Sequence, residues 1–349
     1  MLMISWYLFP RLFLTLTFMT SLPFAFKRIT LVGTLLLSLS AASTTWAQST
    51  ATADWPSKPV RIVVPFAPGG SSDTLGRAIA QQLQLALKQS FVVENRAGGG
   101  GTVGSSQVSK SAPDGYTLVV SGIASHVIAP TENKVYNPLT DFTHIAMLAG
   151  PPLVLAVNAA VPVKNVQEFI AYAQSTKGGL SWGSPGQGTH GHIVGELFSR
   201  KAKFEQTHIS YKGAGPAVAD LISGQIPAAV MTYSSANAHI SSGKLRGLAT
   251  TSSKRVSDQP DIPTFAELGY PELTSTTWFS LSGPPGMPAD LVQKINQEVR
   301  KGMKTPTVQK QLALENMETQ DWDPIKFTSY VAAEVDKWSS ATSVIKGKP

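Results

Sequence analysis

Cysteine is absent from this chain of 349 residues, and charged residues make up only 15% of it. Without disulfides, the stability of the fold must come from buried apolar surface. After residue 47, no apolar segment is long enough to span a bilayer. The balance of apolar and charged residues gives no sign of disorder, so we expect a folded globular protein from there on.

Acidic residues are absent from the first 47 residues. Lys27-Arg28 precede the apolar run Ile29–Ala42, and Thr45-Trp46-Ala47 resembles a cleavage site. This pattern predicts a secretory signal peptide over residues 1–47, cleaved near Ala47. A second apolar block, Met1–Phe18, leaves two alternatives open: a true start at Met19, or a two-pass membrane anchor.

A block of basic residues with interleaved aromatics is also missing, which argues against nucleic acid as a partner. Removal of the predicted signal peptide takes away Arg11, Lys27 and Arg28 and lowers the formal net charge from +7 to +4. This charge weakly suits an anionic ligand. The remaining 300 or so residues are enough for two domains.

The most informative stretch is Pro59–Arg77. Val60–Val64 is a β-branched run typical of a strand buried on both faces, and prolines and glycines end it at residues 65–70. Ser71, Ser72 and Asp73 are helix N-caps by type and precede apolar residues at helical spacing. A helix start after a glycine turn presents free N–H groups that favour an anion, although an ordinary strand–helix connection looks the same.

The same design recurs along the chain. Strands and helices alternate as βαβαβ up to residue 122, which predicts a mostly parallel sheet with helices on both faces. Strand, glycine turn and helix follow one another again over 180–198 and over 208–222. We expect an α/β protein with two lobes and two crossings between them: lobe 1 from 48–149, lobe 2 from 150–274, and a return to lobe 1 over 275–349. A cleft between such lobes can close on a small molecule.

Several enzyme and cofactor motifs are incomplete. Two G-x-G-x-x-G matches, at Gly99 and Gly186, lack the other features of a dinucleotide site, so we expect no cofactor. The histidines show no metal-ligand spacing, and no P-loop is present. Ser184 lies in W-G-S-P-G, which is not the nucleophile elbow of an esterase; a secreted serine esterase with Ser184 as nucleophile nevertheless remains an alternative.

Three other side chains have two interpretations each. Tyr211 either lines a cleft or fills the core. Asp73 either caps its helix or contacts a ligand, and Asp220 is a second carboxylate that might do the latter.

A series of motifs then resembles a known family. In chain order they are P-F-A-P-G-G-S-S-D, V-E-N-R-A-G-G-G-G-T-V-G, P-D-G-Y-T-L, G-S-P-G-Q-G-T-H-G-H-I-V-G-E-L-F, Y-K-G-A-G-P-A-V-A-D-L-I-S-G-Q-I, S-G-K-L-R-G-L-A-T-T and D-I-P-T-F-A-E-L-G-Y-P. From Trp55 to the C-terminus the chain is similar to the Bug family, the extracytoplasmic solute-binding receptors of tripartite tricarboxylate transporters.

The resemblance implies a two-lobed periplasmic-binding-protein fold of type II, and a non-enzymatic, monomeric protein in the periplasm. Its partners would be a small carboxylate solute and the membrane subunits of a transporter; a receptor that feeds a signalling system is an alternative. Family members hold the carboxylate largely through backbone amides, small hydroxyls and waters. Carried over, the ligand-binding residues would be Phe66, Pro68, Gly69, Gly70, Asp73, Ser184, Gly188, Thr189, Gly213, Ala214, Gly215 and Asp220.

One departure from the family pattern concerns ligand choice. His190 replaces a residue that is often small, and near the mouth of the cleft it would alter which ligand is accepted.

Overall fold

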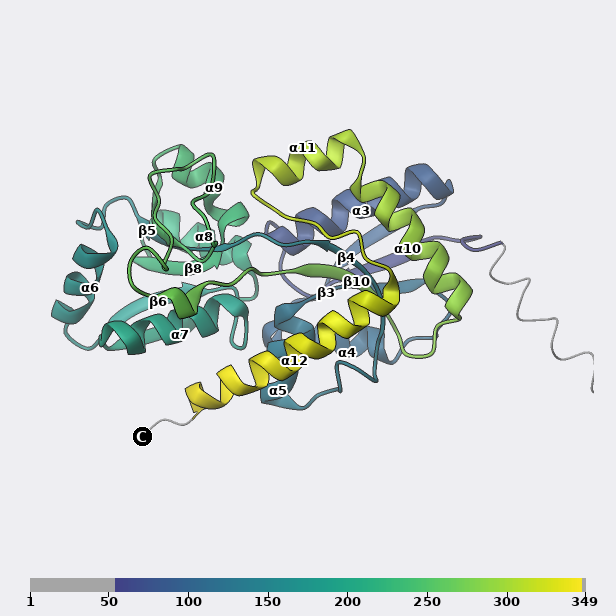
Figure 1. Cartoon of the computed structure of the whole chain (residues 1–349), viewed down its shortest axis with the longest axis horizontal. Coiled ribbons are helices and arrows are strands. Elements are labelled where there is room, and N and C mark those ends of the chain that lie inside the picture. Colours follow the sequence, from purple (N-terminus) through teal and green to yellow (C-terminus); the bar gives the residue numbers. More distant parts are fainter. Residues whose placement is uncertain (1–53, 347–349) are drawn as a thin grey trace, which may run out of the picture. The chain divides into compact units, whose positions relative to one another are not determined.

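The computed structural model describes residues 54–346, which form two five-stranded sheets flanked by helices (Figure 1). The predicted signal peptide lies outside the described residues. Within residues 54–346, no helix combines the length and the apolar character needed to cross a bilayer.

The first sheet has the strand order β2-β1-β3-β10-β4. β1 pairs in parallel with β2 and β3, whereas β10 runs antiparallel to both of its neighbours, β3 and β4. The strands are β1 (Val60–Val64), β2 (Phe91–Asn95), β3 (Thr117–Gly122), β4 (Thr143–Ala149) and β10 (Phe279–Gly283).

Helices cover both faces of this sheet. α3 (Ser71–Leu87) and α10 (Ala289–Met303) contact each other and form one core with Val60, Ile62 and Val64. Val63 points to the opposite face and packs with Val108 of α4 (Thr102–Ser109). β1 is therefore buried on both faces, as its apolar run predicts.

The second sheet has the order β7-β6-β8-β5-β9. Here β5 is the reversed strand, antiparallel to β8 and β9, and the other pairs are parallel. Two separate cores lie on its two faces. The elements are β5 (Leu153–Asn158), α6 (Val166–Ser175), β6 (Leu180–Ser184), α7 (His190–Ala202), β7 (Gln206–Ser210), α8 (Ala214–Ser223), β8 (Ala228–Thr232), α9 (Tyr233–Ser241) and β9 (Leu245–Thr250).

Two segments connect the sheets and lie side by side. Residues 150–152 link β4 to β5, and residues 274–278, called the return segment below, lead back to β10. The Thr277 N–H donates to the Pro151 carbonyl at 3.1 Å. Gly150 permits this approach, because a Cβ there would lie 1.9 Å from the Thr277 carbonyl oxygen. The two crossings thus form one paired link between the sheets.

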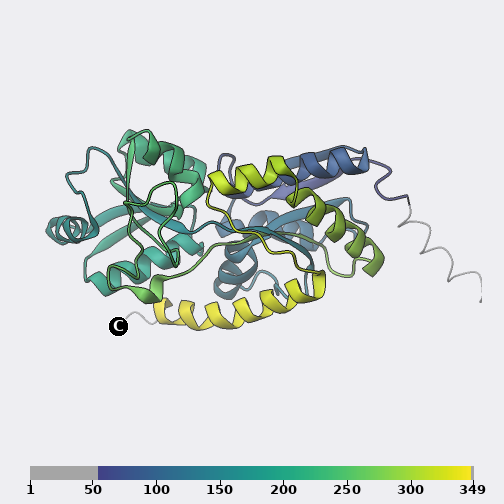
Figure 2. The ribbon, with the colours of Figure 1, turned by 45° about the horizontal axis from the view of Figure 1, so that its top comes forward.

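The C-terminal helix α12 (Pro324–Lys346) spans both halves (Figure 2). It contacts β4 of the first sheet and α7 of the second, and also packs on the π-helical turn η2 (Ala124–Ile128). The link between the two sheets is therefore reinforced by a helix as well as by the crossings.

The structure confirms the expected α/β class and the two-lobed arrangement of mostly parallel sheets. Four strands of each sheet run in one direction, and the reversed strands β10 and β5 are the ones that follow the crossings. The expected βαβαβ unit is β1-α3-β2-α4-β3.

The structure corrects the expected N-cap of α3. Gly70 is the N-cap, and Ser71, Ser72 and Asp73 are the first three helical residues. α7 begins at His190, directly after the glycine turn, and its N-cap is Thr189.

The sequence pattern does not predict several further helical segments. α9 is rich in serine, alanine and asparagine and buries only Tyr233 and Ala236, so its apolar periodicity is weak. The others are η2 with the following α5 (Ala129–Asn133), α11 (Pro306–Leu314), and the short η1 (Gly99–Gly101) and η3 (Pro271–Leu273).

Candidate functional site: a cavity where three helices begin

A cavity of about 50 Å³ lies where both sheets and the return segment meet. Its polar lining consists of hydroxyls and one histidine, and none of these described lining residues is Asp, Glu, Lys or Arg. They are Phe66, Gly70, Ser71, Ser72, Ala124, Leu153, Pro185, Thr189, His190, Gly191, Ala214, Thr232, Thr277 and Phe279.

Three helices begin at this cavity: α3 at Ser71, α7 at His190 and α8 at Ala214. The starts of α3 and α8 have no side-chain cap, and their N-caps are Gly70 and Gly213. The first N–H groups of a helix have no partner within the helix, and the helix N-terminus carries a partial positive charge. The cavity therefore favours an anion and disfavours a cation.

The starts of α3 and α8 come from different sheets, yet they touch. A Cβ on Gly70 would lie 3.3 Å from the Cβ of Ala214, and a Cβ on Gly69 would lie 3.6 Å from the Cα of Gly215. The Ala67 N–H donates to the Lys212 carbonyl at 2.8 Å. Only residues with little or no side chain allow the two helix starts this close.

A hydroxyl cluster also joins the two halves beside the cavity. Ser71 Oγ lies 2.7 Å from Thr232 Oγ1, 2.5 Å from Ser234 Oγ and 3.2 Å from Ser235 Oγ. Hydroxyls can donate or accept, so this cluster adapts to a polar group next to it.

A second cavity, of about 220 Å³, adjoins the first and shares Phe66 and Pro185 with it. Its wall includes the four glycines 98–101, all with positive φ, together with Ser210, Tyr211 and Lys212. Phe66 and Pro185 therefore border both cavities.

The twelve predicted ligand residues fall into two groups. Phe66, Gly70, Thr189 and Ala214 line the first cavity, and Phe66 also lines the second. The other eight line neither of these cavities: Pro68, Gly69, Asp73, Ser184, Gly188, Gly213, Gly215 and Asp220. Several of those eight, among them Asp73, Ser184 and Gly188, make contacts that hold the loops, as described below.

Asp73 secures the first glycine turn. Its carboxylate accepts from the Gly69 N–H at 3.2 Å, from Asn95 Nδ2 at 2.9 Å, and from Arg77 Nε and Nη2 at 3.1 and 2.9 Å. Burial acts to raise the pKa of Asp73, but the hydrogen bonds from Arg77, Asn95 and Gly69 outweigh it and hold that pKa below its usual value. The carboxylate is therefore charged and neutralised locally.

Asp220 has a comparable supporting position in the other lobe. It accepts from the Tyr211 hydroxyl at 2.7 Å. Burial and the neighbouring Asp220 raise the pKa of Tyr211 to about 12. Tyr211 itself lines the second cavity, which favours the cleft interpretation of this residue over the core one.

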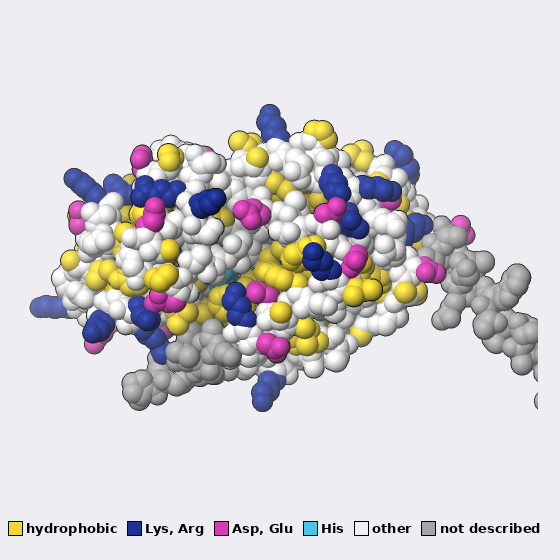
Figure 3. Space-filling model, viewed as in Figure 1, with side chains coloured by type: hydrophobic (Ala, Val, Ile, Leu, Met, Phe, Trp, Pro, Cys, Tyr) yellow, Lys and Arg dark blue, Asp and Glu magenta, His cyan; other side chains and the backbone are white. Residues whose placement is uncertain are grey.

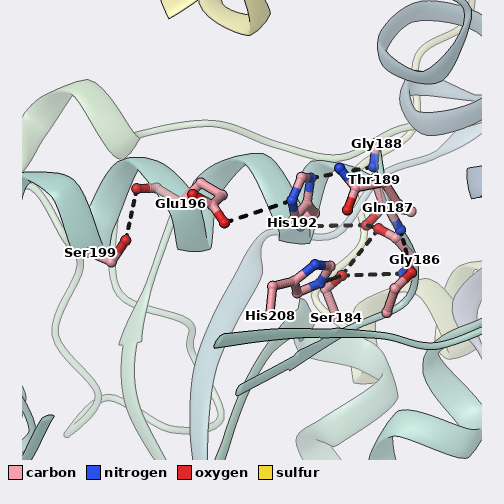
Figure 4. Close-up of polar contacts among 10 residues, drawn as sticks. Ser184, Gly186, Gln187, Gly188, Thr189, His192, Glu196, Ser199 and His208 are labelled. Carbon is pink, nitrogen blue, oxygen red and sulfur yellow. Dashed lines mark hydrogen bonds and ion pairs between the residues drawn. The ribbon is translucent and has the colours of Figure 1, made fainter. Parts of the chain in front are cut away.

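Ser184 and His192 form hydrogen bonds to the glycine turn before α7, and His208 contacts Ser184 (Figure 4). Ser184 Oγ accepts from the Gly186 N–H at 3.2 Å and lies 2.8 Å from His208 Nε2. The Gly188 N–H donates to His192 Nδ1 at 3.3 Å. Ser184 is fully buried and belongs to the loop support, an arrangement that does not favour the esterase alternative.

Both histidines are neutral under this loop. Burial lowers the pKa of His192 to about 4; burial and the neighbouring His192 lower that of His208 to about 3. Because His192 Nδ1 accepts a hydrogen bond, its proton is assigned to Nε2, which lies 3.9 Å from Glu196 Oε1. Because the rings of His192 and His208 carry no charge, the positive electrostatic potential at the cavity comes mainly from the helix starts.

His190 is at the cavity wall and not at the mouth of the cleft, which corrects the expectation for this residue. The side chain is buried, with Nδ1 at 2.9 Å from Thr277 Oγ1 and Nε2 at 2.9 Å from Ser275 Oγ. Burial, with a smaller effect of Lys337, lowers the pKa of His190 to about 3. The ring therefore shapes the cavity without adding charge.

Of the five residues with hydroxyls that line the cavity, the sequence-based site residues include only Thr189 and omit Ser71, Ser72, Thr232 and Thr277. Ser71 and Ser72 fell within a recognised motif but were interpreted only as caps. Thr232 and Thr277 belong to a strand end and to the return segment, and no local pattern distinguishes them from other threonines.

Basic and acidic side chains are interspersed on the face shown in Figure 3. Among the residues from 54 to 346, no group of three or more His, Cys, Asp or Glu side chains is placed to hold a metal ion.

Two lobes with a cavity where they meet are the architecture of a solute-binding protein, and comparisons identify its family. The family model for the "Tripartite tricarboxylate transporter family receptor" matches residues 75–346. Protein BugT of Bordetella pertussis is 33% identical over 288 residues, which cover 82% of this chain and 88% of BugT. The chain belongs to the tripartite tricarboxylate transporter receptors, and the resemblance to the Bug family is confirmed.

Solved structures agree with this assignment. The periplasmic binding protein BugD is 29% identical, with a TM-score of 0.81 over 84% of this chain and 99% of BugD. Rpa4515 of R. palustris, solved with adipate, is 32% identical, with a TM-score of 0.80 and coverage of 84% and 99%. MatC of Rhodopseudomonas palustris, solved with malate, is 30% identical, with a TM-score of 0.79 and coverage of 82% and 99%.

The neutral histidines predict how stability depends on pH. A histidine whose pKa is about 4 in the folded protein and about 6.5 in the unfolded chain is protonated first in the unfolded chain. The free energy of unfolding should therefore stay constant between about pH 7 and 8 and fall as the pH drops from about 6.5 to 4, by up to about 1.4 kcal/mol per pH unit for each such group. Urea unfolding across this range measures it.

Replacing His192 with Gln should make this pH dependence shallower, because glutamine does not titrate. His239→Gln is the matched control, since His239 lies on α9 away from the loop. A free energy that stays flat between pH 7 and 4.5, or equal slopes in the wild type and both variants, would contradict the prediction.

Proposed function

We propose that this solute-binding protein captures a small carboxylate between its lobes and delivers it to the membrane subunits of a tripartite tricarboxylate transporter. The observation that supports this most is the meeting of three helix starts at one cavity without a charged lining residue. Adipate and malate in two related structures are carboxylates as well.

The binding energy would come from backbone N–H groups and hydroxyls. A helix N-terminus stabilises a negative charge by roughly 0.3–1 kcal/mol at exposed sites and by up to about 2 kcal/mol when partly buried. Three such ends, with the hydroxyls of Ser71, Ser72 and Thr232 beside them, can hold a carboxylate without an arginine.

In this proposal the twelve expected residues divide by role. Phe66, Gly70, Thr189 and Ala214 contact the ligand, and the remaining eight fix the turns or let the lobes approach.

The lobes comprise residues 48–149 with 275–349, and 150–274; sheet membership supports this division. Opening and closing would occur at residues 150–152 and the return segment, with the ligand favouring the closed form.

The proposed function makes ligand charge decisive. Dicarboxylates such as succinate and malate should raise the melting temperature, because a ligand that binds only the folded protein stabilises it, whereas their uncharged amides should not. Differential scanning fluorimetry against acids and matched amides, with sodium chloride as the ionic control, measures this. Equal shifts with acid and amide, or none with any acid tested, would refute carboxylate binding.

Gly215→Ala tests whether closure is needed. A Cβ on Gly215 would lie 2.2 Å from the Pro68 carbonyl oxygen in the opposite lobe, while alanine favours the helix that contains it. The variant should fold but lose the shift caused by acids. Ala219→Ser, on the exposed side of the same helix, should retain it. An unchanged shift in Gly215→Ala would argue against a site between the lobes.

We also propose that the protein is not an enzyme. Ser184 is buried and its hydroxyl holds the Gly186 turn. A fluorophosphonate probe, which labels activated serines, should leave Ser184 unmodified in the folded protein. Labelling that disappears in Ser184→Ala would support the esterase instead.

Finally, we propose export and a monomeric state. The periplasmic protein should begin just after Ala47, because the signal peptide is removed on export. Its native mass should equal that of one mature chain. Intact and native mass spectrometry of protein from a periplasmic extract measure both quantities. Retention of residues 1–47 would favour the membrane anchor, and a doubled native mass would rule out the monomer.

A further inference from the structure

His190 occupies an unusual place at the cavity. It is the first residue of α7, so its backbone belongs to one of the three helix starts, and it is one of the residues that line the cavity. Both ring nitrogens lie 2.9 Å from hydroxyls, Nδ1 from Thr277 and Nε2 from Ser275. These two partners belong to the return segment that links the lobes.

The ring is also fixed by α12. It packs edge-to-face on the indole of Trp338, with ring centroids 5.0 Å apart and an interplanar angle of 77°. Trp338 Nε1 donates to Glu334 Oε2 at 3.2 Å, and Trp278 Nε1 donates to the same oxygen at 3.1 Å. His190 is thus held by its own helix, by the return segment and by α12.

A wall fixed in this way discriminates by size. The side chain cannot turn aside without breaking two buried hydrogen bonds and an aromatic contact, and buried polar groups left without a partner destabilise the fold. The cavity that it borders has a volume of only about 50 Å³. With both nitrogens engaged, the ring also has no free polar atom to offer a ligand, so its effect is steric.

We propose that His190 determines ligand size: its imidazole, locked against the return segment and α12, narrows the cavity and restricts the protein to short carboxylates. This inference rests on the proposed function, because it concerns the choice among ligands of that site. Exchanging the ring for a hydroxymethyl group would enlarge the cavity and expose the Ser275 and Thr277 hydroxyls to a longer ligand.

The test compares relative affinities for malonate, succinate, glutarate and adipate by isothermal titration calorimetry. One methylene in a pocket changes affinity by roughly 10- to 200-fold. The wild type should prefer the shorter acids, and in His190→Ser the ratio of adipate to malonate affinity should rise at least about 10-fold. His190→Asn, a second variant with a smaller side chain, should change the ratio in the same direction. His239→Ser is the matched control and should keep the wild-type ratio.

The ratio separates size selection from a general structural role, which would weaken all acids alike. If the wild type binds none of the four acids, the proposed function fails. If the wild type binds but both folded His190 variants keep its order of preference, the inference is overturned and the proposed function stands. A changed ratio in His239→Ser would equally overturn the assignment to His190.

Discussion

The structure depends on bringing the positive ends of helices from two lobes together. α3 and α8 begin without side-chain caps, and their first turns touch through Gly70 and Ala214. Two like partial charges at this distance repel, and a negative group between them converts the repulsion into attraction to both. In the proposed function, closure of the lobes and binding of an anion are therefore coupled.

The glycine-rich turns make this contact sterically feasible. A Cβ on Gly215 or Gly100 would come within 2.3 Å of a carbonyl oxygen of the opposite lobe. The carboxylate of Asp73 and the rings of His192 and His208 then fix the turns from behind. These polar side chains, which by their chemistry could bind a ligand, thus hold the backbone in place, and the backbone of the helix starts faces the cavity.

This exchange of roles explains what the sequence could and could not predict. β1, its glycine turn and α3 were recognisable because strand burial and turn chemistry are local. The role of Asp73 could not be recognised in this way, because it depends on hydrogen bonds from Arg77 and Asn95. Asn95 belongs to the neighbouring strand. Thr232 and Thr277 reach the cavity only through the pairing of the sheets and of the two crossings, so no nearby residue signals them.

The same reasoning separates recognition of charge from recognition of size. Backbone N–H groups contact a carboxylate in the same way whatever carbon chain carries it, so the glycine turns alone would accept many acids. Selectivity must then come from the lining side chains, among them Phe66, Phe279 and the proposed size-limiting His190. Because the His190 ring is hydrogen-bonded to the return segment, the residue that we propose to limit ligand size is also connected to the segment at which we propose that the lobes close.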